Sequence, residues 1–247
     1  MEILLVRAAN PSPYTLDGTN SYVVGRDPAW VLDPGPALDV HLDALAAAVA
    51  ERGGAGGIAL THDHPDHAEA VEPLRARLGD VPVGRLPPLA DGDAFGPFTT
   101  YHVPGHAADH LVFVTGADAF TGDAVLGVGS VLLMPDGGGL GPYLDGLRRL
   151  RGLGLERLHP GHGPEVGDAD AKLDEYVAHR KMRERQIVKI LKSGPARIPD
   201  IVGQLYTDTP DGLMEMAQRQ THAHLLKLKA EGKVDGSSVK AAWTLVG

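Results

Sequence analysis

The chain has 247 residues, of which 43% are hydrophobic, and a formal net charge of −9 at pH 7. This length suffices for one large domain or for a medium domain with a small one, and the hydrophobic content excludes a disordered chain. The chain has no cysteine, which excludes disulfides and thiolate metal ligands.

Charge is distributed unevenly along the chain. Residues 1–171 hold 10 Arg and 23 Asp plus Glu, a net charge of −13, whereas residues 172–247 hold 13 Lys plus Arg and 9 Asp plus Glu, a net charge of +4. All eight lysines lie at or after Lys172. Such a change predicts a domain boundary, with a first domain over residues 1–170 and a second over residues 171–247.

The first domain is predicted to contain short apolar strands that end in polar, Gly- or Pro-containing loops. The predicted strands are 2–8, 20–25, 30–33, 57–61, 98–103, 110–116, 119–123 and 156–160. Apolar residues at helical spacing predict helices over 39–53, from 65 or 66 to 78, and over 142–151. His41 is expected on the surface of the first helix. The mixture lacks strict alternation of strand and helix, which indicates an α+β fold whose sheets are covered by helices on their outer faces.

The second domain is predicted to be mostly helical. Helices are expected over 172–194, over 196–206 and from 210 to a stop at Gly232, followed by two strands around a turn at 235–238. Three helices and then a hairpin is the order of a winged helix. The N-terminus resembles a first strand rather than a signal peptide, and no apolar run is long enough to cross a membrane. We therefore expect a cytoplasmic protein that does not bind membranes.

The stretch THDHPDHAEA, residues 61–70, places three histidines and two aspartates within seven positions. Further histidines and an aspartate follow other predicted strands, in VPGHAADH, TGDAV and HPGHGP. Neutral imidazole and carboxylate are the ligands of a divalent cation, and a cation removes the cost of crowding them. The candidate metal ligands are His62, His64, Asp66, His67, His106, Asp123 and His162.

The spacing of these residues supports a shared site. His62 and His64 are two residues apart on an extended segment, so that both side chains point to one side. Gly105 and Gly161 are expected to permit tight turns before His106 and His162. A single histidine is more often structural than a ligand, and His110 and His159 are expected only near the site. The loop 18–20 either borders the pocket or forms a plain turn.

The motif order HxHxDH, GH, GD and PGHG resembles that of the metallo-β-lactamase superfamily, over residues 1 to about 165. The resemblance implies an αββα sandwich, here followed by the C-terminal winged-helix domain. It also implies two divalent metal ions per chain. The residues that would hold them are His62, His64 and His106 for the first, Asp66, His67 and His162 for the second, and Asp123 as a bridge. True dinuclear zinc β-lactamases lack this aspartate and many use a cysteine, so the resemblance argues against β-lactamase activity.

A closer resemblance covers the whole chain, through GTNSYVV, VLDPG, PGHAADH, TGDAVLGVGS, PYLDGLRRL, PGHGPEV, AKLDEYVAHRKMRERQI and the winged-helix tail. These segments are similar to the β-lactamase-like protein 2 group. Its animal members act as endoribonucleases on single-stranded RNA, and some fungal relatives hydrolyse acyl-carrier thioesters. The chain departs from the group at Asp63 and at Ala68 and Glu69, which leaves the substrate open.

Two cations about 3.5–4 Å apart would share a water, lower its pKa and so supply hydroxide as the nucleophile. Asp66 is the expected catalytic residue, which accepts the proton of the water or orients it. Zinc is the expected metal, with manganese or iron as alternatives. The expected function is that of a phosphodiesterase or endoribonuclease on single-stranded RNA. The alternatives are a thioesterase, lactonase or other small-ester hydrolase, and a non-enzymatic nucleic-acid binder.

The basic tail has several possible roles. Binding of RNA phosphates would involve residues such as Lys181, Arg183 and Arg185. Alternatively, the tail covers the rim of the active site, or it forms a homodimer.

Overall fold

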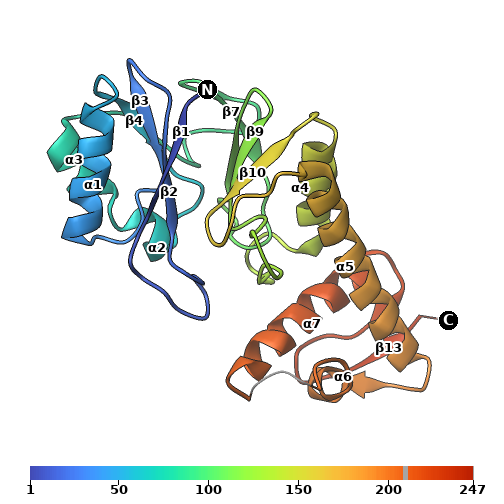
Figure 1. Ribbon diagram of the computed structural model, residues 1–247. Helices are drawn as coiled ribbons and strands as arrows, with labels where there is room; N and C mark the ends of the chain where they lie inside the picture. Colours follow the sequence, from blue (N-terminus) through green and yellow to red (C-terminus); the bar gives the residue numbers. More distant parts are fainter. Residues whose placement is uncertain (208–210, 247) are drawn as a thin grey trace.

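The N-terminal third of the chain builds a sheet with helices on one face. The computed structural model describes residues 1–207 and 211–246. The first sheet has the order β1 (Ile3–Arg7), β2 (Asn20–Val24), β3 (Ala29–Leu32), β4 (Ala55–Ala59) and β5 (Val83–Gly84). Its outer face is covered by α1 (Asp39–Ala50) and α3 (Val71–Leu78), and the short α2 (Pro65–Ala68) lies near its edge (Figure 1).

A second sheet packs face to face against the first (Figure 1). Its order is β10 (Arg157–Pro160), β9 (Asp118–Gly122), β8 (Leu111–Thr115), β7 (Phe98–His102) and β6 (Ala94–Phe95). The helix α4 (Leu140–Arg151) and the first turns of α5 (Ala169–Leu191) cover its outer face. The four layers form the αββα sandwich that the motif order implied.

The central strands are apolar on both faces because each face is buried. In β2, Tyr22 and Val24 contact the opposite sheet, while Val23 between them packs beneath α1. In β8, Phe113 joins the layer between the sheets, while Val112 packs beneath α4. The two-residue period of a strand produces this division, and it explains why these segments are continuous apolar runs in the sequence.

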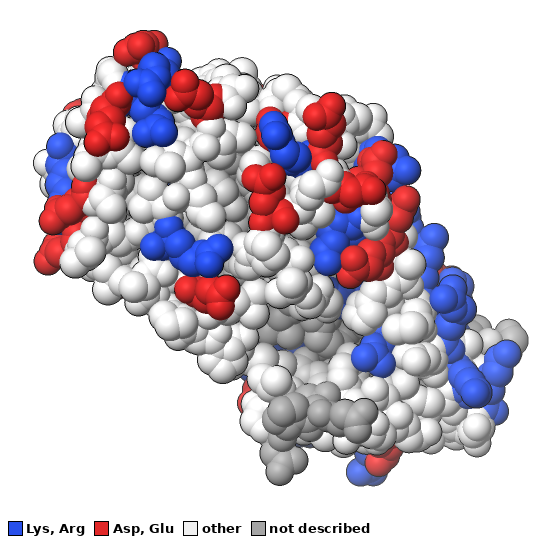
Figure 2. Space-filling view, in the orientation of Figure 1, with Lys and Arg blue, Asp and Glu red and all other residues white. Residues whose placement is uncertain are grey.

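The C-terminal part is a small winged-helix domain. It consists of the second half of α5, α6 (Ile198–Leu205), the 3₁₀ helix η1 (Asp211–Leu213), α7 (Met214–Ala230) and a sheet of β11 (Ala196–Arg197), β13 (Ala242–Leu245) and β12 (Val234–Asp235). The fully buried Trp243 of β13 lies in its core with Ile187, Ile201 and Leu225. Lys and Arg side chains gather over α5, while the sandwich mixes acidic and basic ones (Figure 2).

All eight strands predicted for the first domain are confirmed. The structure adds β5, β6 and β11, which are two residues long and have no periodic pattern to find. The helix predicted to run to residue 78 is interrupted at Glu69 and Ala70 and forms α2 and α3. His41 was wrongly expected at the surface, since its Nε2 lies 2.9 Å from Ser21 Oγ in the interior. The predicted start of the last helix at residue 210 and the end of the second domain at residue 247 lie outside the described residues.

Helix α5 belongs to the packing of both domains. Leu173 and Tyr176 lie in the core under the second sheet, and the Tyr176 hydroxyl accepts a hydrogen bond from the Leu126 N–H at 3.0 Å. Ile187 and Leu191 lie in the core of the winged helix. The division at residue 170 therefore stays a prediction, because the helix that follows it is shared. Among the described residues, no helix has the length and apolar character required to span a membrane.

A buried arginine joins the two domains. Arg180 of α5 donates through Nη2 to the Val131 carbonyl at 2.6 Å and through Nη1 to Gln220 Oε1 of α7 at 3.3 Å. Its guanidinium lies 5.9 Å from the ring centroid of Tyr143 on α4. Among the described residues no carboxylate pairs with Arg180. The Val131 carbonyl, the Gln220 amide and the Tyr143 ring therefore stabilise the charge of Arg180. These contacts connect the loop around Val131 with the C-terminal domain.

Replacing this arginine tests the junction. Arg180→Ala is expected to lower the free energy of unfolding by about 2–3 kcal/mol, because hydrogen bonds of a charged group are lost from a buried site. Chemical denaturation measures the change. Arg219→Ala is the control, since Arg219 is exposed and pairs, within the described part of the chain, only with Glu215 one turn away on α7. Equal stabilities of the two variants would contradict a stabilising role for the buried arginine.

Candidate metal centre

Seven predicted ligands meet at one edge of the sandwich because each follows a strand whose end lies there. The four that come first follow β4 and occupy the loop and helix α2, one follows β7, one follows β9 and one follows β10. They are His62, His64, Asp66 and His67, then His106, Asp123 and His162. All seven predicted residues are thus brought together, from positions up to a hundred residues apart.

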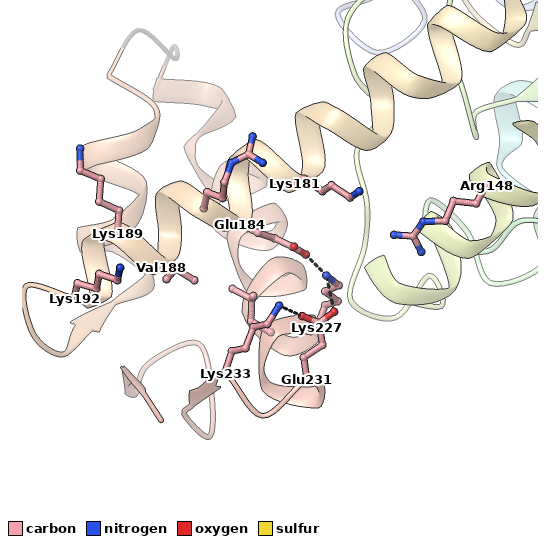
Figure 3. A pocket seen from close by; sticks show the side chains of 11 residues that line it. Arg148, Lys181, Glu184, Val188, Lys189, Lys192, Lys227, Glu231 and Lys233 are labelled. Carbon is pink, nitrogen blue, oxygen red and sulfur yellow. Dashed lines mark hydrogen bonds and ion pairs between the residues drawn. The ribbon is translucent and has the colours of Figure 1, made fainter. Parts of the chain in front are cut away.

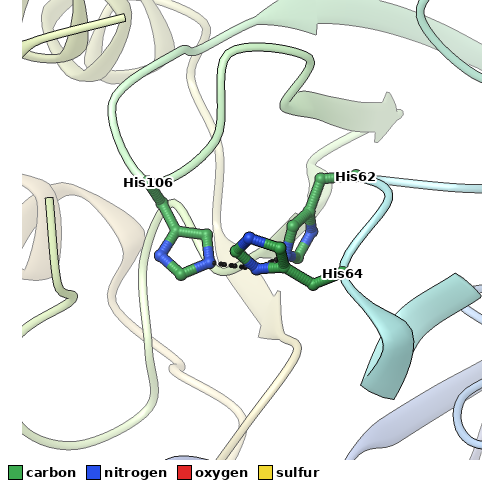
Figure 4. A group of neighbouring side chains, drawn as sticks. All are labelled: His62, His64 and His106. Carbon is green, nitrogen blue, oxygen red and sulfur yellow. Dashed lines mark hydrogen bonds between the residues drawn. The ribbon is translucent and has the colours of Figure 1, made fainter. Parts of the chain in front are cut away.

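The first group consists of three imidazoles, His62, His64 and His106 (Figure 4). Nδ1 of His64 lies 3.0 Å from Nε2 of His62 and 2.8 Å from Nε2 of His106. The three rings point toward one another, from the loop after β4 and the loop after β7 (Figure 4). Ring nitrogens at such separations are spaced as the ligands of one small cation are.

The second group consists of Asp66, His67 and His162. Nε2 of His67 lies 3.3 Å from Nε2 of His162, and Asp66 Oδ2 lies 3.2 Å from Nε2 of His162. Asp66 and His67 are neighbours in the first turn of α2, so the helix presents both to the same space. The side chains of His67 and His162 are buried, while that of Asp66 is partly exposed on the open side.

Asp123 lies between the two groups. Its Oδ2 is 3.4 Å from Nε2 of His106 in the first group. Its Oδ1 is 3.5 Å from Nε2 of His67 and 3.4 Å from Nε2 of His162 in the second. This buried Oδ1 has no hydrogen-bond partner among the described residues. A carboxylate with one oxygen toward each group has the position of a bridge.

The hydrogen bonds around the cluster select the tautomer of four of its imidazoles. Nδ1 of His106 donates to the Leu132 carbonyl at 3.0 Å, and Nδ1 of His162 faces the Gly18 carbonyl at 3.4 Å. A carbonyl only accepts, so each ring directs its Nε2 lone pair into the cluster when neutral. The loop that contains Gly18 thus contacts His162, although none of residues 18–20 lines the cleft beside His64 and His106.

Asp33, at the end of β3, fixes the remaining two rings. Its Oδ2 accepts from Nδ1 of His67 at 2.8 Å and from the Thr61 hydroxyl at 2.8 Å. The same hydroxyl lies 3.0 Å from Nδ1 of His62 and accepts from it, because its own hydrogen is directed at Asp33. The sequence placed Asp33 at a strand end but did not assign it a role. The only feature of the sequence that could have indicated a role for Asp33 is its position directly after β3, because no local pattern connects Asp33 with His67.

The charges of the cluster favour a cation at its centre. Burial opposes the charge of His67, yet the carboxylates of Asp33 and Asp123 raise its pKa well above the usual value. Burial likewise opposes the charge of Asp123, but His67 and the other imidazoles hold its pKa well below the usual range. Burial, with His67 and His110 nearby, lowers the pKa of His62 well below normal. Ionised carboxylates and a neutral imidazole together provide what a divalent ion requires.

Two glycines allow the loops to approach closely. A Cβ on Gly161 would lie 2.6 Å from Cε1 of His67 and 2.9 Å from Asp123 Oδ1. Gly161 therefore leaves space for the ligands, rather than only permitting the turn that was predicted. Gly105 does form such a turn, with φ at +147°, and a Cβ there would also meet Tyr143 at 2.7 Å.

Other histidines near the site have different surroundings. His110 stacks on His62 with a centroid distance of 4.9 Å, and its Nε2 accepts from the Asp123 N–H at 3.1 Å. His159 was expected nearby but contacts Asp118 and Glu165 instead, at 2.9 and 3.3 Å. His110 thus supports the cluster directly, and His159 does not touch it.

A cleft of about 250 Å³ opens beside the first group. Its walls include His64 and His106 on one side and the loop of Met134, Asp136 and Gly137 on the other. Asp63 is not among the lining residues; its backbone N–H donates to Asp109 and its carboxylate pairs with Arg85 at 3.2 Å. The donor types, the convergent lone pairs and the unpartnered oxygen of Asp123 all fit divalent metal ions.

Comparison with known proteins agrees with this architecture. Residues 198–243 match the family of the β-lactamase associated winged helix domain. A metallo-β-lactamase family protein from Thermus thermophilus has a similar structure, with a TM-score of 0.73 and 23% identity, over 99% of this chain and 98% of that one. This likeness concerns the fold and includes the C-terminal domain.

Two curated relatives cover nearly the whole chain. The β-lactamase-like protein 2 homolog of Caenorhabditis elegans is 30% identical, over 92% of this chain and 83% of its own length. An atrochrysone carboxyl ACP thioesterase of Aspergillus chevalieri is 31% identical, over 94% of this chain and 82% of its own length. The chain therefore belongs to the metallo-β-lactamase superfamily of metal-dependent hydrolases, among the relatives of β-lactamase-like protein 2.

Proposed function

We propose that the chain is a dinuclear hydrolase that cleaves phosphodiester bonds in single-stranded RNA. The observation that carries this proposal is the position of Asp123, with one oxygen toward each of the two ligand groups. Displacement at phosphorus uses a pair of cations to stabilise both the attacking and the leaving oxygen, and a bridging carboxylate fixes such a pair.

The two groups of side chains would hold one divalent ion each. The three imidazoles of the first group form one site, and Asp66 with the two imidazoles of the second group forms the other. The bound ions supply a water of lowered pKa as the nucleophile and stabilise the charge that develops on the attacked group. Zinc is the metal that we expect for imidazole and carboxylate ligands, and manganese and iron accept the same ligands.

Asp66 is the residue that we assign to the proton of the attacking water. Burial raises the pKa of Asp66, but its contacts with His162 and His67 hold the pKa below the usual value, so that it is ionised near neutral pH. Its Oδ2 lies 3.6 Å from Nε2 of His67 and 3.2 Å from Nε2 of His162, and its side chain is partly exposed. This carboxylate would accept a proton from the water or orient the water, and no Ser or Cys nucleophile is required.

RNA as the substrate is supported by the resemblance to a group whose animal members act as endoribonucleases. The net charge of +4 over residues 172–247 also favours an anionic polymer. In this proposal the sandwich supplies the chemistry and the tail supplies attraction for phosphates.

Hydrolysis of a thioester is the second candidate, and an apolar groove favours it, because the segment that lines this groove also lines the metal cleft. The groove has a volume of about 220 Å³ and lies between residues 135–142 and α7. Leu140, Pro142 and Leu226 are among its walls, which suit an acyl chain. The relative named as an ACP thioesterase points to the same chemistry.

Metal content tests the ligand assignment. The purified chain is expected to contain about two divalent ions, because two groups of ligands are present. His62→Ala combined with Asp123→Ala should lose most of this metal, as elemental analysis would measure. The control combines His222→Ala with Asp43→Ala, which removes the same residue types outside the cluster. Undiminished metal in the first variant would refute the assignment.

The role of Asp33 predicts an effect on metal affinity. Asp33→Asn replaces one acceptor oxygen with an NH₂ group that faces the donors of Thr61 or His67. The ring of His67 is then no longer held in place, so metal affinity is expected to fall about 10–100-fold. Competition with a chelator measures this affinity. Asp118→Asn is the matched control, because Asp118 is also a buried carboxylate bonded to a histidine, His159. If both variants bind metal as tightly as the wild type, Asp33 does not orient the ligands.

Two substrates distinguish the reaction classes. The metal-loaded chain is expected to cut labelled single-stranded RNA, and Asp123→Asn should lower that rate by orders of magnitude because the bridge is weakened. A panel of acyl thioesters is assayed in parallel. The nuclease proposal would be replaced by the thioesterase proposal if the chain left RNA uncut but turned over a thioester rapidly, and if Asp123→Asn abolished that turnover.

A further inference from the structure

A cleft of about 660 Å³ lies where α4, α5 and α7 meet, and its walls are mainly cationic. Seven of its eleven lining side chains are Lys or Arg and two are Glu. Lys181 of α5, Arg148 of α4 and Lys227 of α7 point toward the same space from three helices (Figure 3). Anionic groups that enter this space would therefore meet positive charge on several sides.

The two glutamates of the cleft are already neutralised. Lys227 lies 2.7 Å from Glu184 and 2.8 Å from Glu231, and Lys233 also lies 2.8 Å from Glu231. These contacts are internal to the walls (Figure 3). The remaining cations of the cleft are thus not balanced by its own acidic residues.

Four of those cations form a stripe along α5. Lys181, Arg185, Lys189 and Lys192 are exposed and follow one another at intervals of four, four and three residues. Such intervals place side chains on one face of a helix, separated by about 5–6 Å along its axis. None of the four makes an ion pair or a side-chain hydrogen bond with another described residue. By contrast, Arg183 donates to the Leu205 carbonyl, lies over the ring of Tyr206 and is not among the residues that line the cleft.

The cleft is connected to the metal centre along the molecular surface. The segment 134–142 lines the metal cleft with Met134 and Gly137, and it lines the apolar groove with Leu140 and Pro142. Lys227 lines both that groove and the basic cleft. The metal cleft and the groove are thus lined by one segment of chain, and the groove and the basic cleft share the side chain of Lys227.

We propose that this basic cleft binds the phosphate backbone of single-stranded RNA and holds the strand across the groove while the metal centre cuts it. The inference rests on the proposed nuclease function and adds the location of the substrate outside the metal centre. A row of evenly spaced, unpaired cations matches a polymer whose charges repeat at regular intervals. Among the described residues that line the cleft, none is an aromatic on which a base would stack, so the contacts are to phosphates and are independent of sequence.

The test removes three charges from the stripe. The cleft variant contains Lys181→Gln, Arg185→Gln and Lys189→Gln, and the control variant contains Arg26→Gln, Arg219→Gln and Lys240→Gln. The control loses the same charge from exposed positions outside the cleft. For binding, both sets are made in an Asp123→Asn background, which keeps the strand intact. Fluorescence anisotropy then gives the Kd for a labelled RNA of about 20 nucleotides, a length that spans several phosphate contacts, at several salt concentrations.

We expect the Kd of the cleft variant to be at least about tenfold higher. The slope of log Kd against log salt concentration should fall by about 2, because three charges are removed and each phosphate contact contributes about 0.7 to this slope. The control variant should bind as its background does. With Asp123 restored, the cleft variant should turn over a small phosphodiester such as bis(4-nitrophenyl) phosphate at the wild-type kcat/KM. Only the KM for RNA should rise.

Other outcomes would overturn the inference. RNA binding that is unchanged in the cleft variant, or equally weakened in both variants, would show that the cleft is not the binding site, while RNA cleavage would still support the nuclease function. Absent RNA binding, together with cleft-dependent binding of an acidic acyl carrier protein, would make the cleft a protein-docking site. Cleft-dependent RNA binding without any cleavage would support the inference and refute the proposed function.

Discussion

The hydrogen bonds of Asp33 are the interaction on which the metal centre depends. The carboxylate accepts from the Thr61 N–H at 2.7 Å, from the Thr61 hydroxyl at 2.8 Å and from Nδ1 of His67 at 2.8 Å. A buried carboxylate is costly unless its oxygens are satisfied, so this set of bonds stabilises one conformation of the segment after β4. Asp33 adopts a φ of +47°, which a short polar residue tolerates, and this bend turns it toward that segment.

The layered fold explains why the ligands converge. Two sheets packed face to face and covered by helices leave only their edges open, and the loops after β4, β7, β9 and β10 meet at one of them. The tight space there is filled by imidazole rings with centroids 4.3–5.1 Å apart. Gly161 passes beneath His67 and Asp123, where any side chain would displace them. The packing around the buried part of the site is therefore dense.

The winged helix contributes to the same site in two ways. Arg180 and Gln220 both donate to the Val131 carbonyl, at 2.6 and 3.0 Å, in the loop that continues to the wall of the metal cleft. In the mode of RNA binding that we propose, the exposed cations of α5 attract the phosphates and the sandwich supplies the chemistry. The helix α5 packs in the cores of both domains and so connects the two surfaces.

The sequence determined the candidate metal ligands, the eight main strands and the winged-helix order, because these follow from local patterns. Ligands of one cation must be crowded, so HxHxDH is visible within one short segment, and burial on both faces makes each strand a continuous apolar run. Only the tertiary structure decided which tautomer four of the imidazoles adopt; Asp33 and His67, for example, are 34 residues apart. It also decided which cations make no ion pair: Lys181, Arg183 and Arg185 were all candidates for phosphate contacts, but Arg183 lies over the ring of Tyr206 and does not line the basic cleft. Burial and pairing depend on which surfaces meet, and that information is not contained in any local segment.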